Sequence, residues 1–115
     1  MSNLFKEDFG MGRIVVVAYK AKPGKLEALK LLMETHSSTL KNEGLVTDRE
    51  SIIMQAKDET IIEVFEWKSK QAIEAAHANP VVQEMWGKYF EICEFIPAGQ
   101  VTEFSEMFSE FTALK

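Results

Sequence analysis

The spacing of apolar residues changes along the chain, and each change predicts the boundary of a new element. Residues 13–20 (RIVVVAYK) are rich in β-branched side chains and lack polar alternation, which predicts a strand covered on both faces. After a break at residues 22–24 (KPG), apolar side chains recur every three or four positions as far as Leu40. This spacing predicts a helix over residues 25–43, and Gly44 then stands where a C-terminal capping glycine belongs.

A hairpin is predicted in the middle of the chain. Its strands are residues 45–55 and 60–67, and the polar residues 57–59 form the turn between them. Arg49 and Glu50 fall in the middle of the first strand and on opposite faces, because side chains alternate along a strand. One of the two charges would then point inward and need a polar ligand or an opposite charge, unless the strand is short or exposed there. Arg49 is therefore a candidate pocket residue.

Two helical segments and a final strand are predicted in the second half of the chain. Ser69 is a suitable N-cap for a helix through Asn79, and Pro80 suits the first turn of the next helical segment. The apolar face of that segment consists of Val82, Met85, Trp86, Tyr89, Phe90 and Cys93. Residues 97–99 (PAG) end it, and residues 100–104 indicate a last strand, although the apolar positions there also fit a helical spacing.

Composition and charge restrict the class of protein. The 115 residues are 46% hydrophobic and 27% charged, which is typical of one globular domain. A net charge of −5 without a basic block argues against nucleic acid as a partner. The longest apolar run (14–19) is far shorter than the roughly 20 residues of a membrane helix, and we expect a cytoplasmic protein without membrane contact. One cysteine and two histidines cannot supply a four-ligand zinc site, so no metal is expected.

The order strand, helix, strand, strand, helix, strand predicts an α+β protein with the antiparallel sheet of ferredoxin-like folds. The first strand is apolar on both faces, so a second subunit is expected to cover the free face of the sheet, which gives a homodimer. We divide the chain into an N-terminal arm (1–12), the domain itself (13–104) and a C-terminal tail (105–115). The tail is rich in phenylalanine and is expected to pack at the dimer interface.

Three blocks of the sequence resemble a known family. They are VVVAYKAKPGKLEALKLLM, EGLVTDRESIIMQ and ETIIEVFEWKSKQAIEAAHANPVVQEMW, and the most specific part is residues 67–80. Over residues 13–104 the chain resembles the antibiotic biosynthesis monooxygenase family of dimeric α+β barrels. The resemblance implies two subunits whose sheets pack face to face. It also implies oxygenation of small aromatics or quinols without metal, flavin, haem or any other cofactor.

The family's polar positions are only partly matched in this chain. Family members often carry a histidine four residues before the proline, and here Ala76 occupies that position before Pro80, with His77 one residue later. The acidic residue that the family places two before the tryptophan is replaced by Phe65, two before Trp67. His77 remains a candidate general base because histidine titrates near neutrality, and a surface or capping role is the alternative.

Aromatic and acidic residues supply the other candidates. Trp86 and Tyr89 are three residues apart on one helical face, so they either line a cavity, with the Tyr89 hydroxyl available for catalysis, or belong to the core. Glu63 shares a strand face with Phe65 and Trp67, which places a carboxyl group among aromatic rings. Trp67 either walls a pocket or packs beneath a helix.

The resulting hypothesis is a cofactor-independent monooxygenase that acts on a small aromatic or quinol. Its catalytic candidates are His77 and Tyr89, and its pocket candidates are Trp67, Trp86, Phe65, Glu63 and Arg49. His36, on the apolar stripe of the predicted first helix, is interpreted as a hydrogen-bonded residue rather than a base. Two alternatives stay open because a fold does not determine a reaction: a carrier or sensor of a small hydrophobic ligand without turnover, and an isomerase that works by proton transfer.

Overall fold

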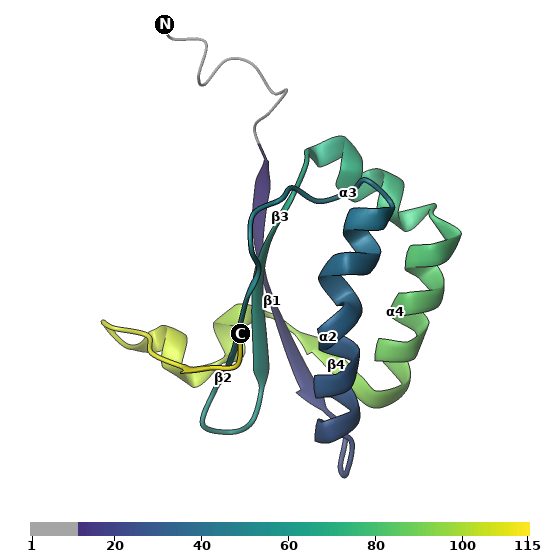
Figure 1. Cartoon of the computed structure of the whole chain (residues 1–115). Coiled ribbons are helices and arrows are strands. Elements are labelled where there is room, and N and C mark those ends of the chain that lie inside the picture. Colours follow the sequence, from purple (N-terminus) through teal and green to yellow (C-terminus); the bar gives the residue numbers. More distant parts are fainter. Residues whose placement is uncertain (1–11) are drawn as a thin grey trace, which may run out of the picture.

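The protein is an α+β domain in which three α-helices accompany a five-stranded antiparallel sheet (Figure 1). The structure is a computed structural model, and it describes residues 12–115. The elements are β1 (Arg13–Ala21), α2 (Leu26–Asn42), β2 (Ile52–Gln55), β3 (Ile61–Trp67), α3 (Lys70–His77), α4 (Pro80–Ile92), β4 (Cys93–Ile96) and β5 (Thr112–Ala113). The strand order is β4-β1-β3-β2-β5. No helix within the described range is long and apolar enough to cross a membrane.

Helices α2 and α4 cover one face of the sheet, which we call the inner face (Figure 1). The pairing of β1 with β3 sets Val17 opposite Glu63 and Tyr19 opposite Ile61, all on this face. Because side chains alternate, β3 also directs Phe65 and its neighbour two residues on toward the helices. The middle of the inner face therefore carries a carboxyl group and a phenol beneath two helices.

Several local predictions are confirmed. Gly44 has a φ of +73° just after α2, a conformation in which glycine has no side-chain penalty. The Ser69 hydroxyl accepts a hydrogen bond from the Ala72 N–H at 3.0 Å and caps α3. The Asn79 side chain accepts hydrogen bonds from the first free N–H groups of α4, which begins at Pro80 as expected. These signals act within a few residues, so the sequence displays them directly.

The predicted strand over residues 45–55 is interrupted in its middle. Val46 forms an antiparallel bridge with Trp67 and the regular strand β2 covers Ile52–Gln55, but residues 48–51 are not in a strand. Arg49 and Glu50 lie outside any strand, and both are exposed. The Thr47 hydroxyl donates to Glu66 at 2.9 Å and accepts from the Arg49 N–H at 3.2 Å. These side-chain bonds compete with a strand ladder and turn the chain away from the sheet. The predicted inward-pointing charge is therefore absent here.

The fourth strand also lies elsewhere than predicted. The helix was expected to include Cys93, but β4 begins there, and residues 100–104 contain no strand. The chain instead forms short 3-10 turns at Ala98–Gln100 and Thr102–Ser105. Pro97 explains the difference, since the residue before a proline avoids helical geometry and favours an extended one. Pairing with β1 then holds this short segment in the sheet.

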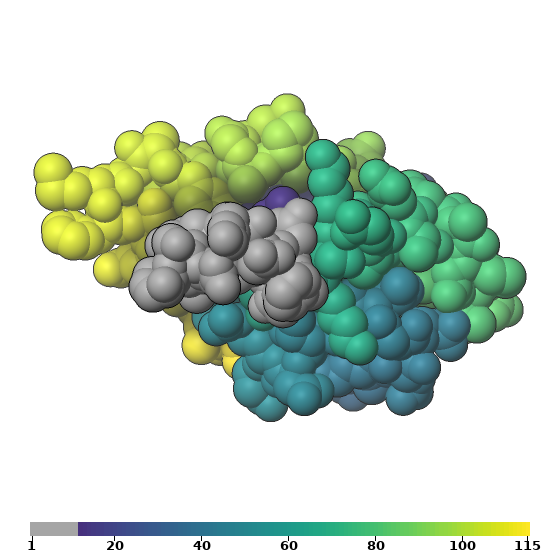
Figure 2. Space-filling view, turned by 90° about the horizontal axis from the view of Figure 1, so that it is seen from above, coloured from purple at the N-terminus to yellow at the C-terminus, as the bar shows by residue number. Residues whose placement is uncertain are grey.

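The opposite, outer face of the sheet is only partly covered. Val101 from the C-terminal segment is buried against Ala18 of β1, and β5 pairs with β2 at the sheet edge. Figure 2 shows this segment extending beyond the body of the domain, away from the helices. Next to it, Ile14, Val16 and Ile52 remain 58%, 44% and 52% exposed. The outer face therefore presents apolar side chains to whatever lies beyond it.

Candidate functional site

The centre of the inner face holds a polar cluster built around Glu63, a residue that is fully buried. The Tyr19 hydroxyl donates a hydrogen bond to Glu63 Oε1 at 2.8 Å. His36 Nδ1 lies 3.1 Å from Oε1 and 3.2 Å from Oε2 of the same carboxyl, and it donates when that nitrogen carries the proton. Burying a carboxyl group without partners is very costly, so these bonds make its position tenable. We call Tyr19, His36 and Glu63 the polar cluster.

Long-range pairing brings the polar cluster together. Tyr19 stands opposite Ile61 on the neighbouring strand, which makes it the diagonal neighbour of Glu63 on the same face. His36 belongs to the buried stripe of α2, together with Met33 three residues before it. The rotation of α2 that buries this stripe also turns the imidazole toward the sheet. Three separate elements thus each deliver one member.

Aromatic rings surround the imidazole of His36. The ring centres of Phe65, Tyr89 and Tyr19 lie 5.4, 5.6 and 6.5 Å from it, all in edge-to-face arrangements. The Tyr89 hydroxyl donates to Met33 Sδ at 3.6 Å and so satisfies its own polar atom. The polar cluster therefore sits in a buried aromatic compartment, where hydrogen bonds and charges act more strongly than in water.

Burial keeps two phenols and one thiol near the polar cluster protonated at neutral pH. Burial, and then the proximity of Glu63, raise the pKa of Tyr19 well above its ordinary value, and the same two causes raise the pKa of Tyr89. Burial raises the pKa of the Cys93 thiol to about 11. That thiol donates to the Tyr89 carbonyl at 3.2 Å. These groups act as hydrogen-bond donors and not as nucleophiles, so the imidazole and the carboxyl are the groups suited to proton transfer.

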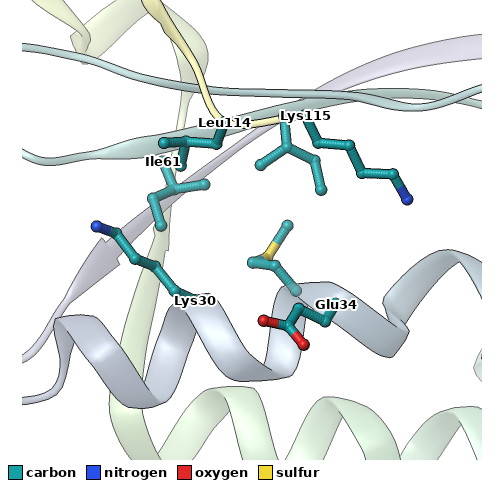
Figure 3. A pocket seen from close by; sticks show the side chains of 7 residues that line it. Lys30, Glu34, Ile61, Leu114 and Lys115 are labelled. Atoms are coloured by element: carbon teal, nitrogen blue, oxygen red, sulfur yellow. The ribbon is translucent and has the colours of Figure 1, made fainter.

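An open pocket of about 300 Å³ (Figure 3) shares Met33, Ile53 and Ile61 with the hydrophobic cluster that contains Tyr19 and Tyr89. It is lined by Lys30, Met33, Glu34, Ile53, Ile61, Leu114 and Lys115. Met33 contacts both the pocket and the aromatic compartment, because it lines the pocket and its Sδ accepts the hydrogen bond from the Tyr89 hydroxyl. Ile53 stands directly opposite Glu63 in the pairing of β2 with β3. The pocket lining therefore includes the cross-strand partner of Glu63 and a residue one helical turn from His36.

Three of the predicted site residues lie in or against the compartment. Glu63 is its central acid, while Phe65 and Tyr89 form part of its wall. Trp67 is also buried on the inner face, with its ring centre 5.3 Å from that of Phe65. The expectation that Glu63, Phe65 and Trp67 share one strand face is confirmed. Their part in any reaction stays a prediction.

The other predicted site residues lie elsewhere. His77 is exposed at the end of α3, with Nδ1 2.9 Å from the Ile73 carbonyl and its ring centre 5.3 Å from that of Trp86. Arg49 is on the surface, where its Nε lies 2.8 Å from Glu66 Oε1. The hydrogen bond from Arg49 is the main cause that lowers the pKa of Glu66. Roles for His77, Trp86 and Arg49 remain predictions.

Sequence reasoning missed Tyr19, Met33 and the whole lining of the pocket. His36 was interpreted as a hydrogen-bonded boundary residue rather than a base. The hydrogen bond is confirmed, but the residue is buried at 3% exposure, and whether it acts as a base stays a prediction. Alternation along β1 does place Tyr19 on one face with Val17, so a buried phenol could have been suspected. Nothing local predicts which residue of another strand stands beside that phenol, since the register depends on the fold as a whole.

The residues 12–115 contain no group of three or more His, Cys, Asp or Glu side chains placed to share a metal ion. The chain matches no protein-family model and no curated protein. The polar cluster and the adjacent pocket are therefore the features of this protein that indicate a function.

Replacing Glu63 tests the polar cluster as a structural element. Glu63→Gln places an amide NH₂ among hydrogen-bond donors, so at least one bond is lost and the free energy of unfolding should fall by about 2 to 3 kcal/mol. The control is Glu94→Gln on β4, which is exposed and should change stability by less than about 0.5 kcal/mol. Urea denaturation at pH 7.5 measures both. Equal effects of the two substitutions would contradict the cluster's contribution.

The raised thiol pKa predicts a loss of stability in alkali. In the unfolded chain Cys93 ionises near its ordinary pKa of 9.0, whereas the folded protein keeps the proton up to about 11. The free energy of unfolding should therefore fall between these values, by at most about 1.4 kcal/mol per pH unit from this group. Denaturation midpoints at pH 8, 9 and 10 should decline less in Cys93→Ala. Parallel pH profiles for the two proteins would rule out the thiol as a cause.

Proposed function

We propose that this protein is a cofactor-independent monooxygenase that acts on a small aromatic or quinol substrate. The observation that carries the proposal is the buried carboxyl of Glu63, held by Tyr19 and His36, whose cross-strand neighbour Ile53 lines an open pocket. Such an arrangement supplies an oriented imidazole in a compartment shielded from water. These are the protein groups that the reaction needs.

The chemistry requires little beyond proton removal from the substrate. When an activated ring methylene or phenol loses a proton, the resulting carbanion or phenolate can itself give electrons to O₂. For a ring methylene, one oxygen atom becomes the carbonyl of the product and the other leaves as water, so the substrate supplies all four electrons. In this scheme Glu63 orients His36 through Nδ1, and the second ring nitrogen takes the substrate proton.

The proposal includes a homodimer of ferredoxin-like subunits that together form an α+β barrel. The strand order β4-β1-β3-β2 supports this topology, with β5 added at the edge. The exposed Ile14, Val16 and Ile52 support a partner on the outer face, because exposed apolar patches on a small domain commonly mark interfaces. A second subunit would also add buried surface to a domain of only 115 residues.

Binding without turnover is the second candidate function, and one observation favours it. Glu63 and His36 are 0% and 3% exposed, so a substrate in the pocket touches the polar cluster only if side chains between them move. A carrier or sensor needs only the pocket and the apolar residues of its floor. A proton-transfer isomerase would use the same groups as the oxygenase but would not consume O₂.

Oxygen uptake tests the proposed reaction. Metal-free protein should accelerate O₂ consumption by an anthrone or a quinol, and His36→Gln should lower that rate by about 10² if the imidazole is the general base. Tyr19→Phe keeps the ring and removes one bond to Glu63, so it should lower the rate less and shift its pH profile. His77→Ala separates the two candidate bases. The polar cluster as active site requires an unchanged rate in this variant, whereas the catalytic role that the sequence suggested for His77 requires a lower one.

The outcomes separate the candidate functions. A loss of rate with His77→Ala alone would transfer the role of base to the exposed histidine and contradict the polar cluster as the active site. Product formation that continues without O₂ would indicate an isomerase. Saturable binding of the same compounds with no product in air would leave the protein as a carrier.

A charge on the outer face tests the homodimer. The wild-type protein should sediment at twice its chain mass of 13.1 kDa, whereas Val16→Lys should sediment as a monomer because it would bury an unpaired ammonium in the interface. Val81→Lys is a matched control, since both valines are 44% exposed and Val81 lies on α4, away from the outer face. A wild-type monomer at tens of micromolar would contradict the dimer.

A further inference from the structure

We propose that the pocket between α2 and the β2 side of the sheet binds a small aromatic carboxylate or another anion with a flat apolar ring. None of its seven lining residues belongs to the sites that the sequence suggested. The inference names the substrate class of the site proposed above. It rests on that proposal for turnover, although binding itself does not depend on it.

The pocket has the size and the floor of a small-molecule site. Its volume of about 300 Å³ is at the lower end for ligand pockets, and about 150 Å³ of apolar cavity already accommodates benzene. Met33, Ile53 and Ile61 form the floor and belong to the main hydrophobic core. The floor is therefore fixed by packing, while the unbranched Met33 can adapt to the shape of a ring. One or two fused rings fit this space.

The charges at the mouth favour an anion. The side chains of Lys30, Lys115 and Glu34 stand around the apolar floor (Figure 3), and their charges sum to +1 in a protein whose formal net charge is −5. Lys30 Nζ is 3.7 Å from Glu27, a long contact to a side chain that is 86% exposed. Such an ion pair is weak, so Lys30 can turn to a carboxylate in the pocket at little cost.

The roof of the pocket is formed by the chain's C-terminal residues. Leu114 and Lys115 each donate a backbone hydrogen bond to the Ile53 carbonyl, at 2.8 and 2.9 Å, and so extend the edge of the sheet over the pocket. Leu114 keeps 40% of its surface exposed. A ring on the floor would cover apolar surface of Leu114 and leave its anionic group at the mouth, within reach of the Lys30 side chain. This geometry orients the ligand with its apolar end inward.

Methyl NMR on the full chain tests the binding. The probe is 1-naphthoate, compared with the neutral 1-naphthalenemethanol, and the signal is the methyl group of Met33, assigned with Met33→Leu. The carboxylate should bind about three- to fivefold more tightly than the alcohol, and Lys30→Gln should remove most of that difference. Lys41→Gln is the control, because this exposed lysine lies on the same helix outside the pocket and should leave both affinities unchanged.

A second variant tests the same inference at the roof of the pocket, where a substitution does not disturb the hydrophobic core. Leu114→Asp places a negative charge on the roof, at a partly exposed position near the chain end, and should weaken naphthoate binding by more than Lys30→Gln does. Equal affinity for the two probes, or equal effects of Lys30→Gln and Lys41→Gln, would overturn the inference. So would the absence of saturable shifts at millimolar probe. Because naphthoate is not autoxidised, its binding can hold while oxygen uptake fails, which keeps the two proposals distinguishable.

Discussion

The buried carboxyl of Glu63 is the constraint on which the rest of the domain depends. A carboxyl group with no water around it needs hydrogen-bond donors from protein, and here they come from β1 and from α2. The bond from Tyr19 agrees with only one register of β1 against β3, and the bond from His36 fixes how α2 is rotated over the sheet. Apolar packing alone would tolerate small shifts of that helix more readily. A polar contact of this kind selects one arrangement.

Features that depend on neighbouring residues were predictable from the sequence, and features that depend on distant pairing were not. The caps at Ser69 and Gly44 and the shared face of Glu63 with its aromatic neighbours follow from rules that span a few positions. The contact of Glu63 with Tyr19 crosses 44 positions, and β5 pairs with β2 across more than 50. Such contacts require the topology, which a local pattern does not contain.

The two incorrect strand predictions have different physical causes. After Thr47, whose N–H still pairs with Glu66, side-chain hydrogen bonds satisfy the backbone, so the polar residues 48–51 leave the sheet. Before Pro97 the apolar spacing continues a helix, but the proline changes the backbone preference of the preceding residue and permits pairing with β1. In both places one competing local interaction outweighed the periodicity. Arg49 therefore lies outside the sheet on the surface, and Cys93 is the first residue of β4 and not part of a helix.

The short strand β5 also has a practical consequence for work on this protein. Its two residues both pair with β2, and the next two residues, Leu114 and Lys115, form the roof of the pocket. A label or cross-linker attached to either of these residues would stand at the pocket and hinder ligand entry. The chemistry of such a label would thus become part of the pocket's surroundings.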